Sequence, residues 1–158
     1  MAKSVPEERD RVGIVDLGSN SIRLVVYDRL ARTPQPLFNE RVICGIGRDI
    51  ATTGRLSPEG VDLALRNLTR FAALANAMHV SELEILATAA TRDATDGAAF
   101  RDLVSDLFGI PVRQLDGAAE ARLALARAAL VGALPPRGLE ADLAIVHLDV
   151  CKSQCSHR

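Results

Sequence analysis

Residues 12–27, with the sequence VGIVDLGSNSIRLVVY, constrain the fold more than any other segment, because they place a small polar turn between two apolar runs. Each run has the length and β-branched content of a buried strand. The turn region contains Asp16, Gly18, Ser19, Asn20 and Ser21. A glycine at positive φ would let the backbone N–H groups of the turn point at an anion. The pattern therefore predicts either a phosphate-binding strand-turn-strand unit or an ordinary hairpin.

The remaining sequence alternates strands and helices in the way that an α/β domain requires. Ser57 before Pro58 predicts a helix start with an N-cap hydroxyl and a proline at the first helical position, and this helix should run to about Met78. Its apolar stripe is expected to comprise Val61, Leu65, Leu68, Phe71, Ala72, Ala75 and Met78. Further helices are expected at 98–108 and 118–130, and strands at 12–15, 22–27, 37–44, 83–87, 112–115 and 143–150. Residues 12–130 therefore predict a mixed five-stranded sheet with helices on its faces.

Length and composition favour a compact lobe that binds neither nucleic acid nor membranes. The chain has 158 residues, 48% of them hydrophobic, and a net charge of -1, whereas non-specific nucleic-acid or membrane binding needs a basic excess. Residues 1–11 lack an apolar signal core, and no apolar run is long enough to span a bilayer, so we expect a cytoplasmic protein. Residues 132–140, with two prolines and Gly138, predict a linker between a lobe at 1–131 and the start of a second lobe at 141–158.

The cysteines do not predict a disulfide framework or a metal centre. Cys44 lies in an apolar strand, where a small core residue is expected. Cys151, Cys155 and His157 lack both the usual Cys-x-x-Cys spacing and a fourth ligand. An unpaired, solvated tail is the better interpretation of this segment.

Several blocks, in order along the chain, resemble the Ppx/GppA family of exopolyphosphatases and guanosine pentaphosphate phosphohydrolases. After the 12–27 segment come Glu40-Arg41 with the passage GIGR at 45–48, then TGRLS at 53–57, ATAATRDA at 87–94 and GAAEARL at 117–123. The resemblance implies an actin-like (ribonuclease H-like) domain. It also implies phosphoanhydride hydrolysis with Mg²⁺.

The resemblance assigns roles to individual residues. From its chemistry alone, the Asp16 carboxylate is expected to hold a divalent ion against the phosphate. The resemblance implies phosphate binding by Gly18, Ser19, Asn20, Ser21 and Arg92, and a general-base role for Glu120. Without it, Arg92 would be a surface partner of Asp93 or Asp96, and Glu120 a helix N-terminal carboxylate that complements the dipole. Ala119 stands where the family often has a second glutamate.

The C-terminal sequence departs from the family. The family has a second phosphate loop, Asp-x-Gly-Gly-Gly-Ser, after a strand like 143–146, but here no glycine follows Gly138. We therefore expect the N-terminal part of a phosphohydrolase for polyphosphate or guanosine pentaphosphate, inactive as this chain alone. The other interpretation is a non-catalytic module that binds a phosphorylated ligand or a protein partner. An exposed sheet edge would also favour association with a second copy as a homodimer.

Overall fold

A five-stranded mixed sheet forms the centre of the molecule. The computed structural model describes residues 11–29 and 34–119. Its strands are β1 (Val12–Leu17), β2 (Ser21–Tyr27), β3 (Pro36–Ile43), β4 (Glu82–Ala87) and β5 (Val112–Gln114), in the sheet order β3-β2-β1-β4-β5. β1, β4 and β5 are parallel, and β2 is antiparallel to both β1 and β3. The predicted α/β class and mixed five-stranded sheet are confirmed.

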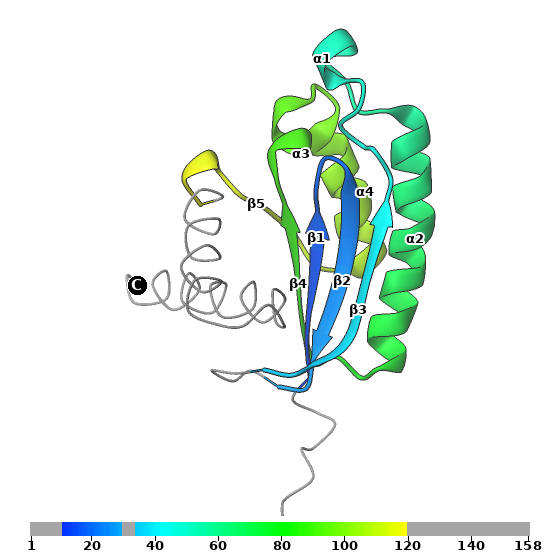
Figure 1. Cartoon of the computed structure of the whole chain (residues 1–158), viewed down its shortest axis with the longest axis vertical. Helices are drawn as coiled ribbons and strands as arrows, with labels where there is room; N and C mark the ends of the chain where they lie inside the picture. Colours follow the sequence, from blue (N-terminus) through cyan, green and yellow to red (C-terminus); the bar gives the residue numbers. More distant parts are fainter. Residues whose placement is uncertain (1–10, 30–33, 120–158) are drawn as a thin grey trace, which may run out of the picture.

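Two long helices cover one face of this sheet (Figure 1). The helices are α1 (Ile50–Thr53), α2 (Pro58–Ala77), α3 (Ala89–Asp93) and α4 (Gly97–Phe108). α2 and α4 pack against the sheet face that carries Val15, Leu24 and Ile85, which we call the helix face. All three side chains are fully buried, so the main apolar core lies between this face and the two helices.

Helix α2 starts where the sequence predicts but presents a slightly different stripe. Ser57 is the N-cap and Pro58 the first helical residue, yet the Ser57 hydroxyl makes no capping bond. It accepts a hydrogen bond of 2.9 Å from Arg48 Nη2. Val61 and Leu65 of the predicted stripe are only half-buried. The buried residues of α2 are Gly60, Ala64, Leu68, Phe71 and Ala75. Gly60 lets the helix approach the loop after β3 closely, since a Cβ there would lie 2.9 Å from both Cys44 O and Gly45 O.

The opposite face of the sheet carries a smaller apolar cluster and several charges. The buried cluster consists of Ile14, Val25, Tyr27, Leu86 and Leu115, and Ala119 packs against it. Because side chains alternate along a strand, the register also places charged residues on this face. These residues are Asp16, Arg23, Arg41, Glu84 and Arg113.

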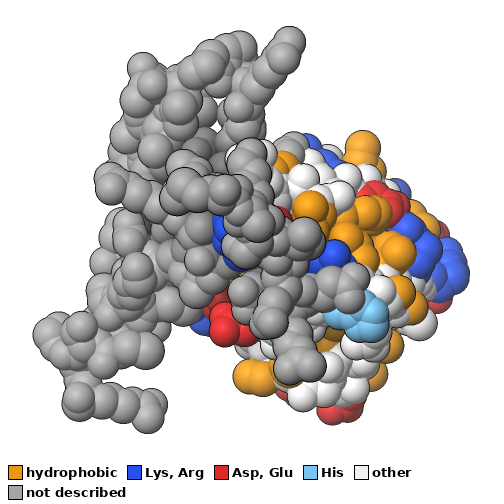
Figure 2. Space-filling model, turned by 90° about the horizontal axis from the view of Figure 1, so that it is seen from below, with side chains coloured by type: hydrophobic (Ala, Val, Ile, Leu, Met, Phe, Trp, Pro, Cys, Tyr) orange, Lys and Arg blue, Asp and Glu red, His pale blue; other side chains and the backbone are white. Residues whose placement is uncertain are grey.

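Several predicted features lie outside the described residues. They are the helix beyond Ala119, the 132–140 linker, the 143–150 strand, and the Cys151, Cys155 and His157 tail. Within the described ranges, no helix combines the length and apolar character needed to cross a bilayer. At the end of the molecule seen in Figure 2, acidic and basic side chains are interspersed with hydrophobic ones.

A charged pair on the opposite face gives a pH prediction. Burial raises the pKa of the Glu84 carboxyl, although Arg113 Nη1, 2.9 Å from Glu84 Oε1, opposes the shift. A raised pKa in the folded state means that folding favours the protonated carboxyl, so this stabilising contribution is lost as pH rises above the ordinary glutamate range. We expect the free energy of unfolding of wild type, relative to Glu84→Gln, to fall between about pH 4 and pH 7. Urea unfolding of both proteins across this range measures the difference, and a difference that rises with pH would contradict the prediction.

Candidate active site at the carboxyl ends of β1 and β4

The turn between β1 and β2 is closed by its own backbone. Gly18 N donates to Ser21 O over 3.0 Å. The expectation that Gly18 takes positive φ is wrong, because the described glycines with positive φ are Gly45, Gly54 and Gly109. Glycine is needed at position 18 for another reason: a Cβ there would lie 3.0 Å from Ser21 O. The residue therefore permits a close backbone approach rather than a left-handed conformation.

The loop after β3 holds this turn from one side. Ser19 O accepts a hydrogen bond from Gly47 N (2.8 Å), and Asn20 O accepts from both Cys44 N and Gly45 N (2.9 Å each). A trans peptide points its C=O and N–H in opposite directions, so the N–H of Asn20 points away from the loop that binds Ser19 O. Ser19 and Asn20 are exposed. We call the three hydrogen bonds from the loop to Ser19 O and Asn20 O the clamp. The clamp leaves the Asn20 N–H directed outward.

Helix α3 packs beside the same turn. Thr88, the residue before α3, donates from N and from Oγ1 to Leu17 O at the end of β1, over 3.2 and 3.3 Å. Gly47 fills the space between the two elements, since a Cβ there would lie 3.0 Å from Ser19 Cβ and 3.3 Å from Ala90 Cβ. Because β1 and β4 are parallel, the turn and α3 follow their carboxyl ends at one edge of the sheet.

Arg92 lies in α3 at this edge. Its Nε is 3.0 Å from Asp93 Oδ1, and its Nη1 donates to Leu115 O over 3.2 Å. The side chain is 36% exposed. Asp96 does not compete for it, because Asp96 Oδ2 lies 3.3 Å from Arg55 Nη2 and Asp96 Oδ1 accepts from Leu56 N. The structure therefore places Arg92 at the predicted edge beside the turn, and its role in phosphate binding stays a prediction.

The side chain of Gln114 holds α3 in position, a role that the sequence did not predict. Its Nε2 donates to the carbonyl oxygens of Ala87, Thr88 and Leu115 over 2.9 to 3.1 Å. Its Oε1 accepts from Thr91 Oγ1 (2.8 Å) and Arg101 Nη1 (3.0 Å). One half-buried amide thus connects the ends of β4 and β5 with α3 and α4.

Removing this amide should be costly. Gln114→Leu removes the acceptor that the Thr91 hydroxyl and Arg101 Nη1 share, and it removes the donor shared by three carbonyl groups. Thr88 O, 3.2 Å from Thr91 Oγ1, remains as an acceptor for the buried hydroxyl. We expect the free energy of unfolding to fall by about 2 kcal/mol, since several hydrogen bonds worth about 0.5–1.5 kcal/mol each are lost while the freed groups keep a second partner. Urea denaturation measures the loss. A change below about 0.5 kcal/mol, the usual range for surface substitutions, would show that solvent replaces these bonds without penalty.

Asp16, the predicted metal contact, lies next to the turn. It is half-buried in β1 on the opposite face of the sheet, one residue before Leu17. Among the described residues, no three or more histidine, cysteine, aspartate or glutamate side chains gather as metal ligands. Mg²⁺ commonly takes one or two carboxylates and completes its shell with water and substrate phosphates. A single carboxylate beside the turn fits that mode, and Mg²⁺ binding by Asp16 stays a prediction.

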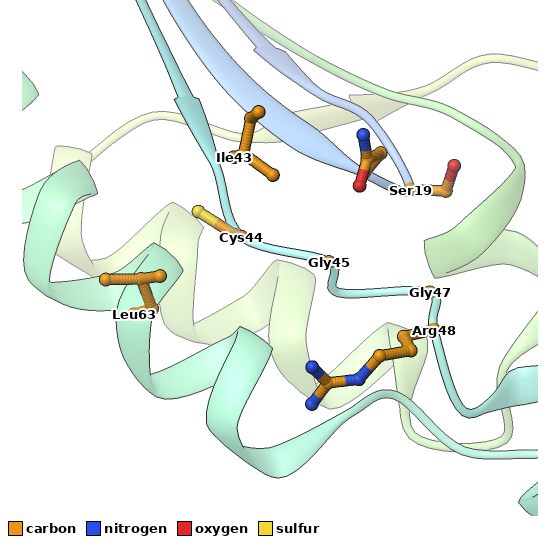
Figure 3. Close-up of a pocket in the computed structure, with 8 residues that line it drawn as sticks. Ser19, Ile43, Cys44, Gly45, Gly47, Arg48 and Leu63 are labelled. Carbon is orange, nitrogen blue, oxygen red and sulfur yellow. The ribbon is translucent and has the colours of Figure 1, made fainter.

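A pocket of about 590 Å³ lies on the loop side of the turn, where the sequence predicted none. Figure 3 shows Ser19 on one side, Leu63 on another, and the chain from Cys44 to Arg48 passing between them. Arg48 Nη2 is held by Ser57 Oγ (2.9 Å) and Glu59 Oε2 (2.6 Å). Cys44 is buried, which raises the pKa of its thiol. Arg92 does not line this pocket.

The predicted base, Glu120, lies outside the described residues, but the chain that leads to it is described. Leu115 N donates to Ala87 O over 2.8 Å, and residues 117–119 are helical. Asp116 Oδ1 caps this turn by accepting from Ala119 N over 2.7 Å. Because Arg92 contacts Leu115 O, the segment toward Glu120 leaves the sheet at the same edge. The role of Glu120 stays a prediction.

Comparisons with known proteins match most of the chain to one family. The sequence pattern of the Ppx/GppA phosphatase family matches residues 25–144. Exopolyphosphatase 2 of Mycobacterium tuberculosis is 32% identical over 122 residues, covering 72% of this chain and 38% of that protein. A crystal structure of an exopolyphosphatase from Cytophaga hutchinsonii has a TM-score of 0.66 at 30% identity, covering 72% of this chain and 36% of that one.

The solved structures also identify the fold. The Ppx/GppA family member from Aquifex aeolicus has a TM-score of 0.68 at 25% identity, covering 82% of this chain and 42% of that one. The predicted actin-like (ribonuclease H-like) fold is therefore confirmed. In each comparison this chain spans well under half the length of the protein that it matches.

Proposed function

Because this chain belongs to the Ppx/GppA phosphatase family, we propose that it is the N-terminal part of an enzyme that hydrolyses terminal phosphoanhydride bonds. The proposed substrates are inorganic polyphosphate and guanosine pentaphosphate. The relatives named exopolyphosphatase support this substrate class.

The observation that carries the proposal is the turn held beside α3. The clamp on Ser19 O and Asn20 O leaves the Asn20 N–H directed outward, and Gly47 brings this turn against the helix that carries Arg92. Fixed N–H donors and a guanidinium are suited to the oxygens of a terminal phosphoryl group, which carries charge through the transition state. A guanidinium can also bind two phosphate oxygens at once.

The proposed reaction divides the roles among the predicted residues. The oxygen of a water attacks the terminal phosphorus, and the bridging P–O bond breaks. The products are orthophosphate and a substrate that is one phosphate shorter. The Glu120 carboxylate accepts the proton of that water. Asp16 would hold Mg²⁺, which neutralises charge on the phosphate oxygens when it is bound.

Phosphate release tests this proposal. We expect the 158-residue chain alone to release little orthophosphate from polyphosphate with Mg²⁺, because its sequence lacks the second glycine-rich phosphate loop. A chimera that joins residues 1–131 to the remaining part of Mycobacterium tuberculosis exopolyphosphatase 2 should restore release. A chimera that binds tripolyphosphate as well as that relative does, yet releases no phosphate, would contradict catalysis by this lobe.

The second candidate function is binding without catalysis, and the exposed edge of the sheet favours it. On strand β3, Leu37 is 48% exposed and Ile43 is 69% exposed. Among the described strands, β3 pairs only with β2, so its other edge can pair with another chain, including a second copy. Sedimentation velocity over a wide range of concentration tests self-association, and a monomer at every concentration would remove this support.

A further inference from the structure

Two arginines lie directly opposite each other near the turn. Arg23 of β2 and Arg41 of β3 are register partners, so their side chains share the opposite face of the sheet. Like charges in this arrangement destabilise a sheet. Arg23 has a carboxylate next to it, since Asp16 is its register partner on β1. Arg41 lies on β3, and no described strand pairs with the outer edge of β3.

Arg41 is held by the turn rather than by an acid. Its Nε donates to Ser21 Oγ over 2.8 Å, and in the described part of the chain the residue forms no ion pair. Other exposed arginines differ in this respect, since Arg66 pairs with Asp62 and Arg70 with Glu40. Among residues 11–29 and 34–119, Arg41 is therefore a cation beside the turn with no acidic partner.

The hydrogen bond between Arg41 and Ser21 also determines which atoms of these two side chains can still donate. Because the Arg41–Ser21 bond uses Nε, neither terminal nitrogen of Arg41 has a partner among the residues that the structure describes. Ser21 Oγ acts as an acceptor in this bond, so its own O–H remains able to donate. Two guanidinium nitrogens and a hydroxyl thus lie next to each other at the end of the turn. This donor set matches the oxygens of a phosphate group.

We propose that Arg41 binds a second phosphate group of the substrate, the one next to the phosphoryl group held by the turn and Arg92. The proposal rests on the function proposed above and extends it to a chain of at least two phosphates. It predicts that the lobe distinguishes a phosphoanhydride chain from orthophosphate. An arginine that only discourages edge-to-edge strand pairing would make no such distinction.

Titration of the full chain with inorganic tripolyphosphate and with orthophosphate, followed by NMR amide shifts, tests the proposal. We expect Arg41→Gln to weaken tripolyphosphate binding about tenfold or more, because charge-assisted hydrogen bonds are lost. Orthophosphate binding should change less than about threefold. Arg66→Gln is the matched control, since it removes an exposed arginine from α2, and it should leave both affinities unchanged. Because Arg41 is exposed on the sheet edge, the variant should fold, and its amide spectrum verifies this.

The outcomes separate this inference from the proposed function. Equal tripolyphosphate affinity for Arg41→Gln and Arg66→Gln, with a loss in Arg92→Ala, would overturn the role of Arg41 and leave the phosphate site in place. An equal loss for both ligands in Arg41→Gln would overturn the assignment to a second phosphate. If wild type bound neither ligand, the proposed function and this inference would both fail.

Discussion

Gly97→Ala is expected to destabilise the protein strongly, although it adds a single carbon. Gly97 is the buried first residue of α4, and a Cβ there would lie 2.0 Å from Thr91 O and 2.6 Å from Thr91 C. These are backbone atoms, so α3 or α4 must shift. Overpacking of this kind typically costs about 1–3 kcal/mol, and we expect a loss near 3 kcal/mol or above. Urea or thermal unfolding measures the loss.

Gly117→Ala provides the matched control. Gly117 also begins a helical segment, but a Cβ there would meet none of the described residues within 4 Å. Alanine should leave stability unchanged or raise it by about 0.4–1 kcal/mol, because it reduces the entropy of the unfolded chain. If both substitutions changed the free energy of unfolding equally, the conclusion that α4 packs closely on α3 at Gly97 would be wrong.

Glu120→Gln should produce the largest effect on turnover. In the chimera described above, glutamine keeps the size of the side chain but cannot accept the proton of the attacking water. We expect kcat to fall by about 100-fold to 10,000-fold with little change in substrate binding, as for other general bases. Steady-state release of orthophosphate at several substrate concentrations measures both kcat and the apparent affinity for substrate.

Arg92→Ala is the comparison for this experiment, because it should reduce affinity and turnover together. A guanidinium that binds phosphate does so in both the ground state and the transition state. If Glu120→Gln left the rate unchanged, another carboxylate would have to be the base. The role that the family resemblance implies for residues 117–123 would then be wrong.

The sheet was predictable from the sequence because its strands are local apolar runs. The predicted strand 12–15 extends to Leu17, which places Asp16 within β1 rather than in the turn. Helices α1 and α3 were missed because four and five residues are too few to show a helical period. In α2 the hydrophobic pattern alone favoured Val61 and Leu65, but close packing selected Gly60 and Ala64 for burial.

The sequence placed the turn and Arg92 at one edge of the sheet, whereas the contacts that hold them there could not be predicted and their roles stay predictions. The family resemblance named the turn and Arg92, and the structure places both at one edge of the sheet. The clamp by Cys44, Gly45 and Gly47 depends on contacts between distant segments. The same is true of the amide network of Gln114 and of the register that sets Arg41 beside Ser21. None of these leaves a local sequence pattern.

Mapping tripolyphosphate onto the protein by NMR tests whether the turn at 18–21 and the helix with Arg92 form one anion site. Titration of the ¹⁵N-labelled chain should shift the amides of Ser19, Asn20 and residues 89–93 together, and Arg92→Ala should weaken the affinity while the turn stays folded. Shifts confined to other parts of the chain, or unchanged affinity in Arg92→Ala, would contradict a single anion site.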